Sequence, residues 1–138
     1  MACTHRRRGV SWPEALLALL VSHAVGDLLF QTEWQALGKG QGLNAAHGRR
    51  TLGAHLSTYM LAFVPALVWI GLETSALRAL AVAAIVAVTH LLIDDGRLVR
   101  AWLRDVKHAA NPSVGLTIAV DQSFHLLCLL GAALVAAG

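Results

Sequence analysis

Charge is scarce in this chain. Of its 138 residues only 14% are Asp, Glu, Lys or Arg, whereas about 25% is typical of a soluble domain, and 57% are hydrophobic. Cysteine is also rare: Cys3 and Cys128 lie far apart, so there is no CxxC motif and no disulfide framework. These shortages exclude an ordinary soluble domain. They indicate a polytopic membrane protein whose length suits one compact domain.

A cleavage site for a secretory signal peptide is missing as well. The first apolar stretch follows a basic tail, as it does in a signal peptide, but His23 and Asp27 interrupt it and no small-x-small site follows. We therefore expect residues 1–11 to form a basic N-terminal tail. Residues 12–138 are expected to form a single integral membrane domain that keeps its first helix.

Four apolar segments approach the ~20 residues that cross a hydrocarbon core, at about 13–37, 52–72, 75–93 and 112–137. Between the third and fourth segments, Arg97, Arg100 and Arg104 recur at helical spacing with apolar residues among them. This pattern is typical of an amphipathic helix that lies at the membrane interface. The predicted fold is all-α, a four-transmembrane-helix bundle with a short interfacial amphipathic helix before the last span.

Positive charge is clustered in the tail and in two connections, and the net charge is +3. Beside apolar spans, such residues are better explained by topology and lipid head groups than by nucleic acid, so we expect no nucleic-acid partner. The two basic connections lie on one side and favour the cytoplasm, although the arginines of the tail argue for the reverse. We expect a multi-pass protein of the cell membrane, in contact with membrane lipid.

Histidine and aspartate recur at i,i+4 spacing in three of the apolar segments. The pairs are His23–Asp27, His90–Asp94 and Asp121–His125. On a helix the two members of a pair share one face. Ionisable groups inside a membrane are costly to bury and are therefore functional candidates. His55 lies early in the remaining segment, and all these residues fall in the half of an antiparallel bundle nearest the two basic connections. That half is expected to face the cytoplasm.

This set predicts a metal site with nitrogen and oxygen ligands, because helix bundles build such sites from facing helices. The candidate ligands are His23, Asp27, His55, His90, Asp94, Asp121 and His125. They suffice for one divalent metal with carboxylates that orient the imidazoles, or for two metals bridged by a carboxylate. Zinc is the first choice, with manganese or iron as alternatives. Gln31, Tyr59 and Gln122 are expected to orient the ligands, and Asp95 to lie in solvent. A purely structural His–Asp network is the alternative.

The runs HAVGDLLFQTEWQALGK, HLLIDDGR and DQSFH, with His55 between the first two, resemble the bacterial membrane family called domain of unknown function 3307. Its pattern is HxxGDFxxQ…K, H, HxxIDxxK and DQxxH. The matched residues are His23, Gly26, Asp27, Gln31, Lys39, His55, His90, Asp94, Asp121, Gln122 and His125. Arg97 stands where lysine is usual, and Leu28 where Phe is frequent. The resemblance covers nearly the whole chain after the tail. It implies a small polytopic membrane protein and brings no established activity.

One hypothesis is a metal-dependent hydrolase embedded in the membrane. A bound metal would activate water, with Asp94 or Asp121 as the catalytic base. Three basic residues would bind an anionic group of the substrate: Lys39, Arg97 and Arg100. The substrate is expected to be amphiphilic or phosphorylated, because the site opens at the membrane interface.

Other functions stay open. A cation or proton transporter could use the same residues, although the polar groups occupy only one half of the bundle. Haem ligation by paired histidines is disfavoured by the aspartate beside each of them. A non-catalytic membrane partner subunit, in which the His–Asp network holds the helices together, is also compatible with the sequence, and so is a homo-oligomer.

Overall fold

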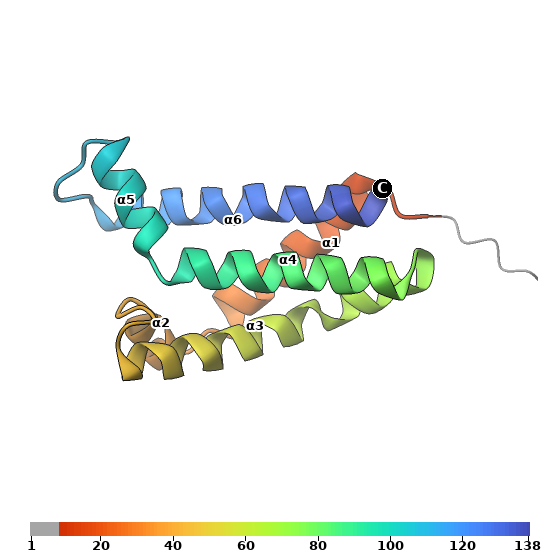
Figure 1. Ribbon diagram of the computed structural model, residues 1–138, viewed down its shortest axis with the longest axis horizontal. Coiled ribbons are helices and arrows are strands. Elements are labelled where there is room, and N and C mark those ends of the chain that lie inside the picture. Colours follow the sequence, from red (N-terminus) through yellow and green to blue (C-terminus); the bar gives the residue numbers. More distant parts are fainter. Residues whose placement is uncertain (1–8) are drawn as a thin grey trace, which may run out of the picture.

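The computed structural model describes residues 9–138, so most of the predicted basic tail lies outside the described residues. Every regular element within that range is a helix. In chain order these are α1 (Trp12–Ala24), the π-helical turn η1 (Val25–Leu29), α2 (Glu33–Lys39), α3 (Ala46–Glu73), α4 (Ala76–Asp94), α5 (Arg97–Asp105) and α6 (Val114–Ala137) (Figure 1). The all-α prediction is confirmed.

Four helical stretches are long and apolar enough to cross a membrane: α1 with η1, α3, α4 and α6, of 18, 28, 19 and 24 residues. At 1.5 Å per residue, even the shortest is about 27 Å long, close to the thickness of a hydrocarbon core. They form a ring in which α3 packs on α4, α4 on α6, α6 on α1 and α1 on α3. Figure 1 shows α2 and α5 at the same end of this bundle. The predicted four-span architecture is confirmed.

Apolar side chains cover the outside of the bundle, whereas polar side chains are buried inside it. Leu17, Leu61 and Leu127 are 66%, 66% and 65% exposed, but His55 and His90 are only 1% and 2% exposed. A soluble helical protein shows the reverse distribution. Hydrocarbon chains of lipid would cover the outer leucines, so the burial pattern supports the assignment of the chain as a membrane protein.

A purely apolar core fills the half of the bundle away from α2 and α5. Phe63, Ile70 and Val82 have no exposed surface there, and neither do Ala132 and Ala136 of α6. Alanines at such positions let membrane helices approach closely, because no long side chain separates the backbones. This packing fixes the helices against one another and so positions the polar half.

The segment predicted as one span over 13–37 is broken, which corrects the prediction. After η1 the helix ends at Phe30, and Thr32 begins the separate helix α2. There the Gln35 backbone N–H donates to Thr32 Oγ1 at 3.3 Å and the Thr32 N–H donates to Gln35 Oε1 at 2.9 Å. Such reciprocal bonds start a new helix. The next helix begins at Ala46 rather than 52, so part of the predicted loop over 38–50 is helical.

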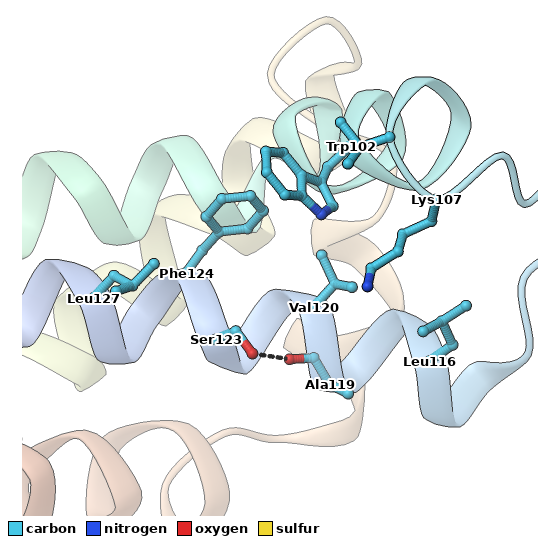
Figure 2. A pocket seen from close by; sticks show the side chains of 9 residues that line it. Trp102, Lys107, Leu116, Ala119, Val120, Ser123, Phe124 and Leu127 are labelled. Carbon is cyan, nitrogen blue, oxygen red and sulfur yellow. Dashed lines mark hydrogen bonds between the residues drawn. The ribbon is translucent and has the colours of Figure 1, made fainter.

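The predicted amphipathic helix is α5. Val99 and Leu103 are buried on its inner face, whereas the side chain of Arg104 is 75% exposed. Between α5 and α6 lies a groove of about 390 Å³ whose walls include Trp102 and Phe124 (Figure 2). None of the predicted metal ligands lines this groove. The polar site is therefore elsewhere in the described part of the chain.

Candidate metal centre

The seven predicted ligands come from all four long helices and meet inside the bundle. The helices supply them as follows: His23 and Asp27 from α1 and η1, His55 from α3, His90 and Asp94 from α4, and Asp121 and His125 from α6. Six of the seven are buried, while Asp121 is partly exposed. Their nitrogen and oxygen atoms form three overlapping groups, and within each group the atoms lie no more than 4.8 Å apart. The structure thus brings together residues up to about 100 positions apart in sequence.

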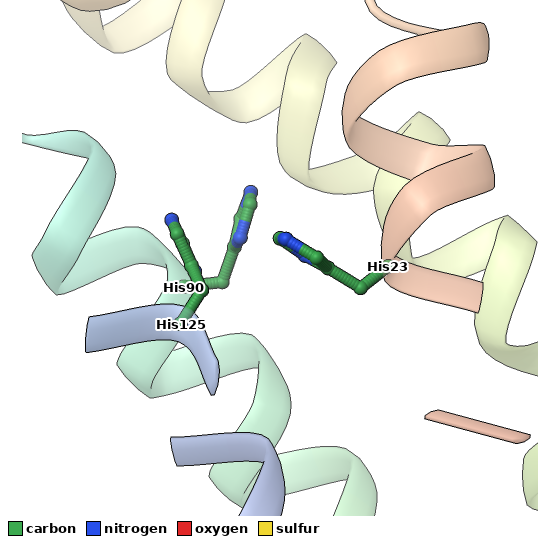
Figure 3. Close-up of side chains that lie close together, drawn as sticks. All are labelled: His23, His90 and His125. Atoms are coloured by element: carbon green, nitrogen blue, oxygen red, sulfur yellow. The ribbon is translucent and has the colours of Figure 1, made fainter. Parts of the chain in front are cut away.

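Three imidazoles line the apolar side of this cluster. Figure 3 shows His23, His90 and His125, from three different helices, turned toward one another. The ring centroids of His23 and His125 are 5.0 Å apart, and those of His90 and His125 are 4.8 Å apart. The ring of Tyr59 stacks on His90 at a centroid distance of 3.5 Å. These contacts restrict how the imidazoles can turn.

The first compact group of possible ligands contains Asp27, His55, His90 and Asp94. His55 Nε2 lies 3.2 Å from Asp27 Oδ1 and 3.2 Å from Asp94 Oδ2. It lies 3.0 Å from His90 Nε2, which is 3.3 Å from Asp94 Oδ2. A tetrahedral zinc ion with bonds of 2.0–2.1 Å separates its ligand atoms by about 3.3 Å. These four side chains can therefore hold a metal ion with little rearrangement.

The second group shares Asp94 with the first. The other oxygen of this carboxylate, Oδ1, lies 3.4 Å from His125 Nε2. His125 Nε2 lies 3.7 Å from Asp121 Oδ2. Asp94 is consequently the residue that connects the two groups.

Four buried atoms of the cluster have no hydrogen-bond partner among residues 9–138. They are Asp27 Oδ1, His90 Nδ1, Asp94 Oδ1 and His125 Nε2. An unsatisfied polar group in a protein interior costs about 1–3 kcal/mol. Three of them still lie within ion-pair distance of another residue of the cluster: Asp27 Oδ1 is 3.2 Å from His55 Nε2, and Asp94 Oδ1 is 3.4 Å from His125 Nε2. These contacts lack hydrogen-bond geometry, and a cation bound there would contact both carboxylate oxygens and the His125 nitrogen.

The predicted orienting residues contact the cluster. Tyr59 Oη lies 2.9 Å from His23 Nδ1, and Gln122 Oε1 lies 3.1 Å from His23 Nε2. Gln122 Nε2 also donates to Asp27 Oδ2 at 3.1 Å. Gln31 Nε2 is 3.3 Å from His55 Nε2. Both nitrogens of His23 thus have protein partners, and the same ring forms one of the three groups of possible ligands together with His90 and His125.

Gly26 has a structural role that its place in the motif did not reveal. A Cβ atom at this position would lie 2.7 Å from Cδ2 and 3.2 Å from Cα of Tyr59. Only glycine allows η1 to approach α3 this closely. Tyr59 in turn contacts the rings of both His23 and His90, so Gly26 shapes the site through Tyr59.

Lys39, at the end of α2, reaches into the cluster. Its Nζ lies 3.0 Å from Asp94 Oδ2 and 3.7 Å from Asp27 Oδ1. Burial alone would lower the pKa of Lys39, but the carboxylates of Asp94 and Asp27 outweigh burial and raise it. The ammonium group therefore stays charged at neutral pH and partly neutralises the buried carboxylates.

Arg97 and Arg100 lie around Asp95 rather than beside the ligands. Arg97 Nε is 2.8 Å from Asp95 Oδ2, and an Arg100 nitrogen is 3.4 Å from the Asp95 carbonyl oxygen. Asp95 itself is only 4% exposed and accepts a bond of 2.6 Å from the Leu43 N–H. The expectation that Asp95 lies in solvent is wrong, because this carboxylate anchors the loop between α2 and α3.

A cavity of about 560 Å³ opens beside the cluster, between η1, α2, α4 and the start of α6. Asp27, Lys39 and Asp121 line its polar side, and Leu28 and Ile118 belong to its apolar side. The last two are 76% and 56% exposed on the outer surface of the bundle. The cavity therefore connects the polar cluster to the face that would meet lipid.

The comparison with known protein families matches residues 15–137 to the family described as "Protein of unknown function (DUF3307)". Nearly the whole described chain is covered, so the chain belongs to this family, as its motifs predict. No curated protein and no solved structure matches the chain.

Proposed function

We propose that this member of the DUF3307 family is a metal-dependent membrane hydrolase. Its divalent metal, with zinc as first choice and manganese or iron as alternatives, would be held by Asp27, His55, His90 and Asp94. The proposal rests on the spacing of four buried ligand atoms. His55 Nε2 lies 3.0–3.2 Å from the ligand atoms of the other three residues, and His90 Nε2 lies 3.3 Å from Asp94 Oδ2. Nitrogen and carboxylate ligands without cysteine suit these metals.

Charge balance supports the same conclusion. Asp27, Asp94 and Asp121 place three carboxylates in the polar half of the bundle, and Lys39 is the cation within 4 Å of two of them. When the carboxylates are ionised, two negative charges are left over unless histidines are protonated. Uncompensated charge is very costly in a membrane interior. A divalent cation would supply the missing charge.

The cavity supports hydrolysis over a purely structural metal. A metal with an open coordination position lowers the pKa of bound water and makes it a nucleophile. Of the two predicted catalytic carboxylates, Asp94 is assigned to hold the metal. We assign Asp121 as the group that accepts the proton from water, because its side chain is 25% exposed and lines the cavity.

The substrate we propose is an amphiphile with a phosphorylated or otherwise anionic head group. The head would lie on the polar wall near Lys39, and the apolar portion would leave past Leu28 and Ile118 toward the lipid. Arg97 and Arg100 remain candidates for contact with the anionic group only if α5 moves, because both now contact Asp95. On the positive-inside argument, this half of the bundle faces the cytoplasm.

Transport of a cation or proton has less support. The half of the bundle beyond the cluster is filled by apolar side chains such as Phe63 and Val82, and it offers no polar path among the described residues. A non-catalytic subunit with a structural network has less support, because the 3.4 Å ion pair between Asp94 Oδ1 and His125 Nε2 lacks the geometry of a hydrogen bond.

Elemental analysis of the protein purified in detergent tests the proposal. We expect at least one zinc, manganese or iron ion per chain in the wild type and a large loss in His90→Ala. His47→Ala is the matched control, because His47 is an exposed histidine of the same bundle. Release of inorganic phosphate from phosphatidic acid in detergent micelles then tests hydrolysis. A wild-type protein without stoichiometric metal would contradict metal binding, and metal without phosphate release would contradict this substrate.

A further inference from the structure

We infer that the cluster holds a second divalent cation, bound by Asp94 Oδ1, Asp121 Oδ2 and His125 Nε2, so that the Asp94 carboxylate bridges two metals. The inference rests on the proposed function for the first metal and adds a second site to it. It assigns the cluster to the class of two-metal centres that act on phosphate esters.

The two oxygens of the Asp94 carboxylate face different residues. Its Oδ2 faces His55 and His90 at 3.2 and 3.3 Å, whereas its Oδ1 faces His125 at 3.4 Å. Each oxygen thus belongs to a different group of possible ligands. A carboxylate that uses both oxygens in this way holds two metals about 3.5–4 Å apart, the separation found in two-metal hydrolytic sites.

Two buried atoms face each other at this site without a hydrogen bond. Asp94 Oδ1 and His125 Nε2 are both buried, and neither has a hydrogen-bond partner among the described residues. They come from different helices, α4 and α6, and their residues are 5% and 2% exposed. The two atoms lie 3.4 Å apart, which is within ion-pair distance but without the alignment of a hydrogen bond. A cation between them would contact both.

The distances also suit a metal. His125 Nε2 lies 3.4 Å from Asp94 Oδ1 and 3.7 Å from Asp121 Oδ2. Ligand atoms at bonds of 2.0–2.1 Å are separated by about 3.3 Å in a tetrahedral site, so a shift of a few tenths of an ångström closes the site. Three protein ligands leave a position open for water or substrate, as catalytic zinc sites do.

Both sites border the cavity, since Asp27, Asp94 and Asp121 all line it. Asp121 is the least buried of the seven predicted ligands. A phosphate group entering there would meet the second metal and Lys39. Asp121 can ligate through Oδ2 and still accept a proton from water through Oδ1, so its role in the proposed hydrolysis is retained.

The test uses the full chain in detergent, loaded with Mn²⁺ after removal of bound metal. Manganese binds oxygen and nitrogen ligands, and two Mn²⁺ ions that share a carboxylate are magnetically coupled. We expect two Mn²⁺ per chain by elemental analysis and an electron paramagnetic resonance spectrum of a coupled pair. Asp121→Asn and His125→Ala should each bind one Mn²⁺ and give the six-line spectrum of an isolated ion. Asp105→Asn, an exposed aspartate, should keep two.

The outcomes separate the two proposals. One uncoupled Mn²⁺ per wild-type chain would overturn the second site and leave the first metal in place. No bound Mn²⁺ and no bound Zn²⁺ would overturn both. Two coupled ions that persist in Asp121→Asn and in His125→Ala would overturn the assignment of the ligands. Circular dichroism identifies a variant that has unfolded, and the partly exposed Asp121 is the safer of the two positions to change.

Discussion

Replacement of Asp94 by asparagine tests the cluster at the residue on which both metal assignments depend. Asparagine has nearly the same shape, but it lacks the negative charge and replaces one ligand oxygen with an NH2 group. Asp94 lies 3.2 Å from His55, 3.4 Å from His125 and 3.0 Å from Lys39. We therefore expect D94N to lose metal binding and to lose stability even without metal.

The size of the effect follows from linkage between binding and folding. A metal supplied at 100 times its Kd stabilises the folded chain by about 2.7 kcal/mol. For a chain of this size each kcal/mol changes the Tm by about 2–4 °C, so removing metal from the wild type should lower the Tm by about 5–10 °C. D94N should show almost none of this shift. Its metal-free Tm should also fall, because breaking a buried ion pair costs about 3–5 kcal/mol.

Thermal melting of the protein in detergent, followed by tryptophan fluorescence, measures both effects. The informative quantity is the difference in Tm between samples with Zn²⁺ and with EDTA, taken within each variant, because it cancels the general loss of stability. D105N should keep the full difference, since Asp105 is an exposed partner of Arg104. A D94N protein that keeps the wild-type difference would refute the assignment of Asp94 as a ligand.

Three further changes test the surroundings of the site. G26A should destabilise the protein by about 1–3 kcal/mol, because its Cβ would lie 2.7 Å from Tyr59 Cδ2, and metal titration should show weaker binding than in wild type. K39M should enlarge the difference in Tm between Zn²⁺ and EDTA, because it removes a cation beside the carboxylates. Because the pKa of Lys39 is raised, its stabilising charge is present below the usual lysine pKa of about 10.4 and is lost only as the pH rises through the raised value. The metal-free Tm gap between K39M and wild type should therefore not shrink as the pH is raised from about 7 to 9. D95A should lower the Tm and speed proteolysis between α2 and α3, since the Leu43 N–H loses its acceptor, while the metal content measured by elemental analysis stays unchanged.

The sequence predicts the fold and the composition of the cluster because both depend on simple patterns. Apolar runs of sufficient length give the four spans, and i,i+4 spacing puts each His and Asp of a pair on one helix face. The position of His55 follows as well, since an antiparallel bundle brings the start of the second span to the end of the third. These inferences need only helix geometry and the cost of burying charge in a membrane.

Other features depend on contacts that spacing does not encode. The break after η1 arises from the local bonds between Thr32 and Gln35, which compete with continuation of an apolar helix. That break turns α2 back, so that Lys39 points into the cluster instead of lying at its mouth. The sequence predicts a solvated Asp95 because a donor to its carboxylate, the Leu43 N–H, comes from a loop that is distant in the sequence.

The three His–Asp pairs are not equivalent, because contacts between helices differ from pair to pair. Asp27 lies 3.2 Å from His55 on another helix, while His23 bonds to Tyr59 and Gln122. His125 Nε2 lies 3.4 Å from Asp94 Oδ1, on another helix, and 3.7 Å from Asp121 Oδ2, its partner at i,i+4 spacing. The i,i+4 spacing within a helix therefore puts the ligands on one face. The packing between helices determines which ligands lie close enough to share an ion. A variant that shifts one helix against another should consequently impair metal binding even when every ligand is intact, and G26A is such a variant.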